Sequence, residues 1–188
     1  MSPDYSLLKI VLIFTLLWVP INDAMARDSY IENCLRSAKP DGHCLRMQRN
    51  LKRWEDSIEI AANKVGIEAA LLKAVVAVES HFNANAQSNS GPVGLTQILP
   101  STARTLGFSK DQLKFPEVNL EAGALYLKVQ LTQFGNQDLA VIAYNLGGKT
   151  QTLNKKSQRH ANLYANEVMS IYEYFKAREK ILEQSNTN

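Results

Sequence analysis

Glu79 is the residue of this chain best placed to act as a proton donor. It lies near the end of an apolar stretch over residues 71–80, and the next acidic residue along the chain is Asp111. Leucine and valine side chains at positions 72, 75 and 76 share a helical face with Glu79, so the carboxyl group points toward the core. Apolar surroundings raise the pKa of a carboxyl group toward neutral pH, as a general acid requires. The alternative is a helix that ends at Val78 and leaves Glu79 in solvent.

A helical hairpin positions Glu79. Apolar residues at helical spacing predict one helix over about 47–65 and a second over about 68–79, with Gly66 as the stop between them. Glycine at a helix end adopts the left-handed conformation that closes the last turn. The segment 83–100 follows, rich in Asn, Ser, Gly and Gln, and a polar loop after a rigid helix is a common place for binding groups.

The rest of the chain also predicts helices. Ser101 and Asn119 are expected to cap two of them, and Gly135 to end the second. The continuous apolar segment 139–145 predicts a central helix wrapped by the others, and residues 164–175 predict an amphipathic C-terminal helix. No strand pattern is found, so we expect an all-α fold with at most a minimal hairpin.

The first 26 residues predict a secretory signal peptide. Lys9 precedes an apolar run over 10–19, and Ala24-Met25-Ala26 supplies a small-x-small cleavage pattern. The run is short for a bilayer span, and an uncleaved anchor is the alternative. Export would place the protein in the periplasm, free or membrane-associated. We divide the remainder into a cysteine-bearing lead-in at 27–50, a catalytic domain at 51–180 and a flexible tail at 181–188.

Cys34 and Cys44 are the only cysteines, and they predict a disulfide in an exported protein. Zinc binding is disfavoured because these two residues and His43 lack four-ligand spacing, so we expect no metal and no cofactor. The formal net charge is +3, spread along the chain apart from a small basic cluster at 155–160. This argues against nucleic-acid binding and suits an anionic polymer better, although a solvated basic loop is the common alternative for the cluster.

Polar residues recur in a fixed order at the ends of the apolar segments. The order is Glu79-Ser80, then Ser88, then Gly94-Leu95-Thr96-Gln97, then Asn119, Gly123, Tyr126 and Leu127, then Ala143-Tyr144-Asn145-Leu146-Gly147. Together these pieces resemble the catalytic domain of soluble lytic transglycosylases, lysozyme-like enzymes that cleave the glycan strands of bacterial peptidoglycan. The resemblance covers roughly residues 67–172. It implies a helical, lysozyme-like domain with a substrate groove.

The resemblance implies roles for individual residues. Glu79 corresponds to the catalytic acid/base, Ser88 to a loop serine near the N-acetyl group and Gln97 to a sugar-contacting amide. Tyr144 corresponds to a hydroxyl beside the reacting sugar. Ser80 is expected to be structural, and so is Asn145, whose amide would tie the helix end to neighbouring backbone.

This chain departs from the family pattern at two positions. Thr96 stands where Met is common, so we count it among the substrate-binding residues and expect it to alter the groove floor and substrate preference. Leu146 stands where a small residue is common. Each of the matched polar residues could instead have a purely structural role. Ser88 and Gln97 would then be ordinary loop residues, Tyr144 a tyrosine of the core and Asn145 a residue at a helix end. We assign no role beyond core or groove wall to Tyr126, Tyr164 and Tyr172.

The distribution of acidic residues bears on the mechanism. Most glycosidases use two carboxylates, one as acid and one as nucleophile or base, yet residues 80–110 contain none. A second carboxylate could come from farther along, at Asp111, Glu117, Glu121 or Asp138. The simpler hypothesis is that the substrate supplies the nucleophile from its own C6 hydroxyl, which would leave a 1,6-anhydromuramyl end.

Two competing functions stay open. One is a muramidase of the goose-lysozyme type, in which water is the acceptor. The other is a non-catalytic, peptidoglycan-binding component of an envelope machine. The small size resembles the specialised transglycosylases that open the wall for secretion, pilus or conjugation systems, so components of such an apparatus are the partners we expect besides glycan strands.

Overall fold

The computed structural model describes residues 29–88, 91–147 and 154–186, so the expected signal peptide lies outside it. The all-α prediction is confirmed: two isolated β-bridges, Gln87 to Val93 and Val93 to Ile98, are the only strand-like pairing within these residues. The helices are α1 (Tyr30–Arg36), α2 (Gly42–Val65), α3 (Ala69–Ser80), α4 (Pro100–Thr105), the 3-10 helix η1 (Gln112–Lys114), α5 (Pro116–Phe134), α6 (Gln137–Asn145) and α7 (Lys155–Asn186).

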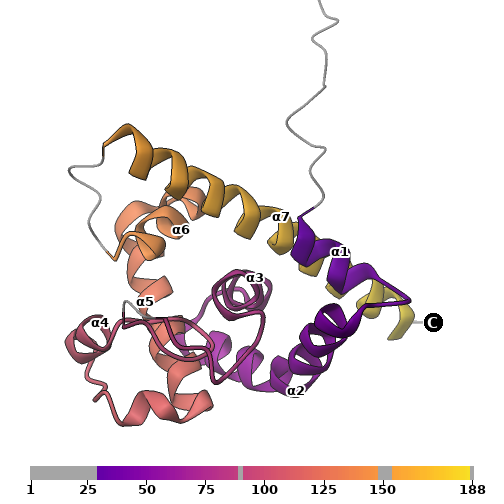
Figure 1. Ribbon diagram of the computed structural model, residues 1–188, viewed down its shortest axis with the longest axis horizontal. Helices are drawn as coiled ribbons and strands as arrows, with labels where there is room; N and C mark the ends of the chain where they lie inside the picture. Colours follow the sequence, from indigo (N-terminus) through magenta and orange to yellow (C-terminus); the bar gives the residue numbers. More distant parts are fainter. Residues whose placement is uncertain (1–28, 89–90, 148–153, 187–188) are drawn as a thin grey trace, which may run out of the picture.

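Helix α3 is the centre of the molecule. All residues from 70 to 77 are buried, and Figure 1 shows α3 end-on among the other helices. A helix that is apolar on every side has to be covered on every side. Our expectation that residues 139–145 form the central helix is wrong, because α6 buries one face against α5 and α7 and leaves Leu139 49% exposed.

The helical hairpin of α2 and α3 forms as predicted. Gly66 closes α2 in the left-handed conformation, with φ of 68°, and Gly135 closes α5 with φ of 62°. Glycine adopts these angles without the steric penalty that a Cβ would add. Helix α3 continues to Ser80, so Glu79 lies in its last turn and the alternative end at Val78 is excluded.

The prediction that Ser101 and Asn119 cap the starts of two helices is wrong. Helix α4 starts at Pro100 and α5 at Pro116, because proline at the first helical position has a suitable φ and lacks only an N–H that would be unpaired there anyway. Asn119 is instead buried inside α5. Its amide holds the preceding loop: Oδ1 accepts from the Thr96 N–H at 2.9 Å, and Nδ2 donates to the Val93 carbonyl at 2.9 Å.

A buried lysine joins three helices behind α3. Lys73 is 2% exposed, and its ammonium group lies 2.7 Å from Glu59 and 3.2 Å from Glu55 of α2, and 3.5 Å from Glu179 of α7. Three carboxylates compensate the desolvation of one cation, which a single buried pair seldom does fully. This network holds α3 in register against α2 and α7.

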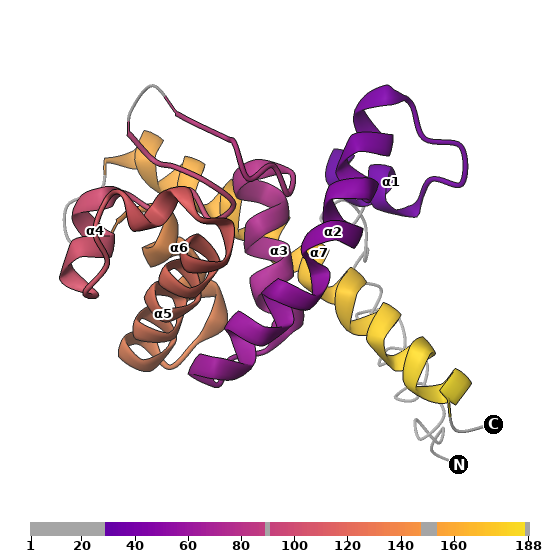
Figure 2. The same cartoon turned by 90° about the horizontal axis from the view of Figure 1, so that it is seen from below.

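The N-terminal helices form a corner of their own. The structure contains the predicted disulfide between Cys34 and Cys44, which joins α1 to the start of α2. Asp41 caps α2 by accepting from the N–H groups of His43 and Cys44, so this helix begins five residues earlier than its apolar pattern indicates. Figure 2 shows this corner and the end of α7 extending away from the rest of the molecule.

The C-terminal helix is longer than expected. Helix α7 continues through residues 181–186, a segment for which the sequence predicts a flexible tail. Among the described residues, no helix combines the length and the apolar character needed to span a membrane.

Candidate active site

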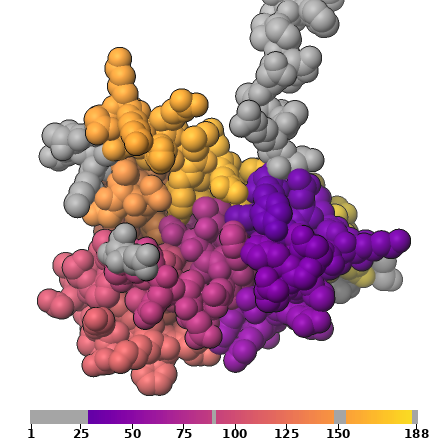
Figure 3. Space-filling model, viewed as in Figure 1, coloured from indigo at the N-terminus to yellow at the C-terminus, as the bar shows by residue number. Residues whose placement is uncertain are grey.

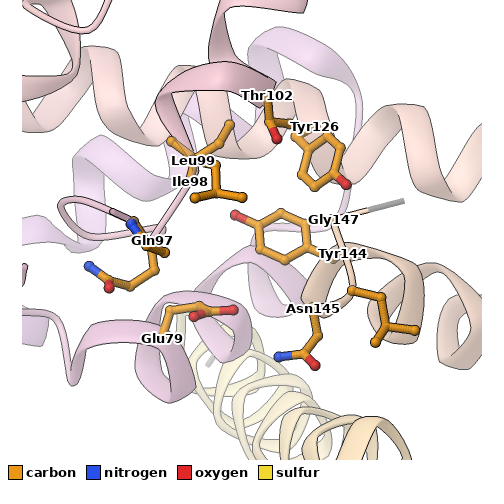
Figure 4. A pocket seen from close by; sticks show the side chains of 11 residues that line it. Glu79, Gln97, Ile98, Leu99, Thr102, Tyr126, Tyr144, Asn145 and Gly147 are labelled. Carbon is orange, nitrogen blue, oxygen red and sulfur yellow. The ribbon is translucent and has the colours of Figure 1, made fainter. Parts of the chain in front are cut away.

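Glu79 borders a cavity of about 240 Å³ at the end of α3. The carboxyl group is only partly exposed, as its position on the apolar helix predicts. Figure 4 shows it facing side chains from the loop before α4, from α4 and α5, and from the end of α6. The other lining residues are Pro92, Gln97, Ile98, Leu99, Thr102, Tyr126, Tyr144, Asn145, Leu146 and Gly147.

Burial sets the protonation state of Glu79. Loss of water around the carboxylate raises the pKa of Glu79 from 4.5 to about 7, and a hydrogen bond from Tyr164 acts in the opposite direction. The Tyr164 hydroxyl donates to Oε1 of Glu79 at 2.7 Å. The pKa of Glu79 therefore lies in the range where a carboxyl group can both give and take a proton near neutral pH.

Tyr164 is the partner that sequence reasoning missed. It comes from α7, 85 residues after Glu79. Burial, with the nearby Glu79 carboxylate, keeps the pKa of the Tyr164 phenol well above its usual value, so the hydroxyl remains a donor. The only sequence signal was its place on the apolar face of the C-terminal helix, which is equally typical of a core tyrosine.

Tyr144 lies at the cavity wall. Its hydroxyl donates to the Thr96 carbonyl at 2.9 Å, and its ring contacts that of Tyr126 at a centroid distance of 5.0 Å. Burial, together with the Glu79 charge, raises the pKa of Tyr144 well above its usual value. The phenol is therefore neutral, and its oxygen can still accept a hydrogen bond from a ligand.

Gln97 lines the cavity from a strained position. Its φ is 46°, which is unusual for a residue with a side chain. Its Nε2 donates to the carbonyls of Ala86 at 3.1 Å and Gly94 at 2.9 Å, so the amide nitrogen holds the loop together. The side-chain carbonyl is the part of Gln97 left to contact a ligand.

Thr96 and Ser80 support the site from behind. Thr96 is fully buried and is not among the cavity-lining residues; its Oγ1 lies 2.9 Å from Oδ1 of Asn119. It packs so closely on α5 that a Cβ added at Gly123 would lie 2.4 Å from it. Ser80 is buried and its Oγ lies 2.8 Å from the Leu95 carbonyl, which joins the end of α3 to the same loop. Thr96 can affect the groove floor only indirectly, through Tyr144 and the loop.

Ser88 lies outside the cavity, and Asn145 lies on its wall. Ser88 is exposed and does not line this cavity; its backbone N–H donates to the Pro92 carbonyl. Asn145 does line the cavity, and its side chain forms no hydrogen bond within the part of the chain that the structure describes. Within the described residues, the N–H groups of Leu146 and Gly147 donate to carbonyls at the end of α6, so the expected tie from the Asn145 amide stays a prediction.

Glu79 is the only acidic residue among the described residues that line the cavity. The segments 89–90 and 148–153, which the structure does not describe, contain no Asp or Glu. The four more distant candidates, Asp111, Glu117, Glu121 and Asp138, all lie elsewhere. Nor do the described residues bring three His, Cys, Asp or Glu side chains together in a group that could hold a metal ion.

Comparisons with known proteins agree with this geometry. The family described as Transglycosylase SLT domain matches residues 56–167, more than half of the chain. The chain is 30% identical over 118 residues to a transglycosylase of Enterobacteria phage PRD1, covering 59% of this chain and 44% of that protein. It is 31% identical over 132 residues to membrane-bound lytic murein transglycosylase E of Buchnera aphidicola, covering 61% and 60%. The chain thus spans about half the length of these curated relatives.

Solved structures share the fold. An inactive variant of lytic transglycosylase Slt from Pseudomonas aeruginosa superposes with a TM-score of 0.60 at 27% identity, over 71% of this chain and 25% of that one. The 70-kDa soluble lytic transglycosylase from Escherichia coli gives a TM-score of 0.55 at 24% identity, over 71% and 26%. The second likeness bears on the fold alone. The disulfide-linked helix α1 lies before the residues that the family matches.

Proposed function

The chain belongs to the transglycosylase SLT domain family, and we propose that it is a peptidoglycan lytic transglycosylase with Glu79 as both acid and base. The observation that carries the proposal is a single carboxyl group with a pKa of about 7 beside a cavity that its described residues line with no other carboxylate. Such a group can serve both halves of an intramolecular transfer near neutral pH.

The chemistry follows from one carboxyl group. Protonated Glu79 donates its proton to the glycosidic oxygen between N-acetylmuramic acid and N-acetylglucosamine, and the bond from that oxygen to the anomeric carbon breaks. The substrate's acetamido carbonyl stabilises the developing positive charge. The Glu79 carboxylate then takes the proton of the C6 hydroxyl, whose oxygen bonds to the anomeric carbon. Glu79 ends protonated again, and no water is consumed.

Tyr164 is the residue that positions the acid in this proposal. Its hydroxyl occupies Oε1 of Glu79 at 2.7 Å, which leaves Oε2 for proton transfer. Because the attacking hydroxyl belongs to the sugar being cleaved, its effective concentration is high and a second protein carboxylate is unnecessary. We propose that Tyr144, Gln97 and Asn145 orient the sugar from the cavity wall, and we keep Ser88 as a predicted contact from the loop.

The competing muramidase needs an acid or base that positions water across the sugar ring. The described residues that line the cavity supply no second carboxylate for this role. A protein that only binds peptidoglycan does not need a buried carboxyl group with a raised pKa, and burying such a group is unfavourable. Both observations favour the transglycosylase.

We propose that the protein acts in the periplasm, on glycan strands. The Cys34–Cys44 disulfide supports this location, because disulfides persist in oxidising compartments. Local wall opening for a secretion, pilus or conjugation system is the biological role that we expect. Recovery of components of such a system by cross-linking in the envelope would support this role.

The decisive experiment is digestion of purified peptidoglycan with the protein lacking residues 1–26, followed by mass spectrometry of the muropeptide ends. We expect 1,6-anhydromuramyl ends from the unmodified protein and none from Glu79→Gln. Glu173→Gln, a change to an exposed carboxylate on α7, is the matched control and should leave the products unchanged. Reducing ends would show hydrolysis instead. Products from Glu79→Gln at the normal rate would overturn the assignment of the acid.

A further inference from the structure

The first turns of α7 carry a basic surface that the active site does not use. Lys155, Lys156 and Arg159 are exposed there, and none of the three forms an ion pair within the part of the chain that the structure describes. The sequence contains no Asp or Glu from residue 139 to residue 166. The three cations lie on a helix rather than in the solvated loop that was the alternative for this cluster. Figure 3 shows the first turns of α7, in orange, projecting at one edge of the molecule.

The position of these cations does not stabilise the helix. Lys155 and Lys156 are the first two residues of α7, where the positive end of the helix dipole disfavours cations. The first turn contains no acidic residue to offset this effect. The Asn154 side chain accepts from the N–H of Ser157 at 2.9 Å and so caps the helix without adding a charge. A negatively charged partner would offset the unfavourable placement of both lysines.

A surface hollow of about 300 Å³ lies on the same face of the helix. All of the residues that line it belong to α7: Lys155, Gln158, Arg159, Asn162, Leu163 and Asn166. Their ammonium, guanidinium and amide groups are hydrogen-bond donors, and a phosphate group can accept from each of them. Leu163 is 58% exposed beside these donors. A face that combines cations with an exposed apolar side chain suits the boundary between lipid headgroups and acyl chains.

The composition of this face favours a lipid surface over a protein partner. Lysine is depleted at protein–protein interfaces, which depend on aromatic side chains and arginine seated in pockets. Among the described residues that line the hollow, none is aromatic. A basic amphipathic helix is instead typical of contact with a membrane surface.

Helix α7 reaches the active site from its other side. Lys155 and Tyr164 are nine residues apart, which makes about two and a half helical turns, so the two side chains lie on opposite sides of α7. Tyr164 donates to Glu79, while none of the three cations lines the cavity. A membrane bound at the basic face therefore leaves the cavity at Glu79 open to a glycan strand.

We propose that the start of α7 binds the surface of a membrane that contains anionic phospholipid. Lys155, Lys156 and Arg159 contact the phosphate groups, and Leu163 lies at the boundary with the acyl chains. The contact is peripheral and reversible, because one exposed leucine buries little apolar area and electrostatic attraction supplies most of the affinity. This inference goes beyond the proposed function and does not depend on the reaction at Glu79.

Cosedimentation with vesicles tests the proposal. The full chain, purified from the envelope after export so that parent and variants share one N-terminus, is mixed with vesicles of phosphatidylcholine alone or of phosphatidylcholine mixed equally with phosphatidylglycerol. We expect tighter binding to the anionic vesicles, and loss of this preference at about 1 M salt, where the screening length falls to about 3 Å. Each cation near an anionic surface contributes about fivefold in affinity, so the triple variant Lys155→Gln, Lys156→Gln, Arg159→Gln should lose about a hundredfold.

A second triple variant controls for net charge. Lys52→Gln, Arg104→Gln and Lys180→Gln remove three exposed cations outside the basic face, and this protein should keep most of its affinity for the anionic vesicles. Thermal unfolding checks the fold: loss of two cations from the first turn of α7 should leave the Tm unchanged or slightly raised.

Three outcomes would overturn the membrane surface. One is equal binding of the parent to both kinds of vesicle, and another is an equal loss of affinity in the two triple variants, which would reflect net charge alone. The third is a loss at residues 155–159 that is seen with purified peptidoglycan and not with anionic vesicles, which would assign the basic face to the wall polymer.

Discussion

Replacement of Glu79 by Gln should stabilise the protein in a pH-dependent way. Burial raises the pKa of Glu79 from 4.5 in an ordinary environment to about 7 in the folded protein. The folded state therefore binds more protons than the unfolded state between these values, and the stability of the unmodified protein falls as the pH rises through this range. The amide introduced by Glu79→Gln cannot be charged, so the variant avoids this loss while it keeps a carbonyl that can accept from Tyr164.

The magnitude follows from the pKa shift. One pKa unit corresponds to about 1.4 kcal/mol, so the shift corresponds to about 3 kcal/mol at most, and partial access to water from the cavity reduces it to about 2 to 3 kcal/mol. Comparison of the variant with the unmodified protein cancels all other groups that titrate in both. The difference in unfolding free energy should be smallest near about pH 4 and largest near about pH 8.

Urea unfolding followed by circular dichroism at a series of pH values measures this difference. Glu173→Gln, the same change of side chain at an exposed position of α7, is the control. A difference between Glu79→Gln and the unmodified protein that stays constant from acid to alkaline pH would refute the argument that burial sets the protonation state of Glu79. A decrease with rising pH would show that the carboxylate is stabilised in the folded protein.

Three further changes test the supporting structure. Tyr164→Phe removes the hydrogen bond that lowers the pKa of Glu79, so the alkaline limb of the pH–rate profile should move to higher pH and the maximal rate should fall about tenfold; an unmoved profile would contradict this. Replacement of both Cys34 and Cys44 by Ser should lower stability by about 2 to 3 kcal/mol in urea unfolding, and the reduced unmodified protein should behave alike. Lys73→Met removes the cation shared by Glu59 and Glu179, which are both partly exposed, while Glu55 keeps its ion pair with Arg178. The fold should therefore lose about 1 to 2 kcal/mol, with activity per folded molecule unchanged in assays below the new Tm.

The sequence predicts most of the local structure around the site. Apolar spacing of 3.6 residues indicates α2, α3, α5 and α7, and the glycines at 66 and 135 end two of them as expected. These signals act within a few residues along the chain, so they can be read without the fold. The errors at Ser101 and Asn119 have the same origin: Pro100 and Pro116 are stronger helix starts, and the buried Asn119 amide serves the loop.

The choice of α3 as the central helix was decided by packing. Both α3 and the segment 139–145 are apolar, and periodicity does not say how many neighbours each will have. The fold surrounds α3 and places α6 at the side, where Leu139 stays exposed. It also leaves Asn145 facing the cavity, because the backbone of α6 closes without help from that side chain.

The sequence by itself identified Glu79 as the candidate acid, because a carboxylate on an apolar helical face is defined by its near neighbours in the chain. Only the tertiary structure could show that Tyr164 holds this carboxylate, that the four distant acidic residues lie outside the cavity and that the cations at the start of α7 lie outside it too. Each of these facts depends on which surfaces of separate helices pack together. That packing is a property of the whole chain, since side chains 85 residues apart meet only after the helices between them have taken their places.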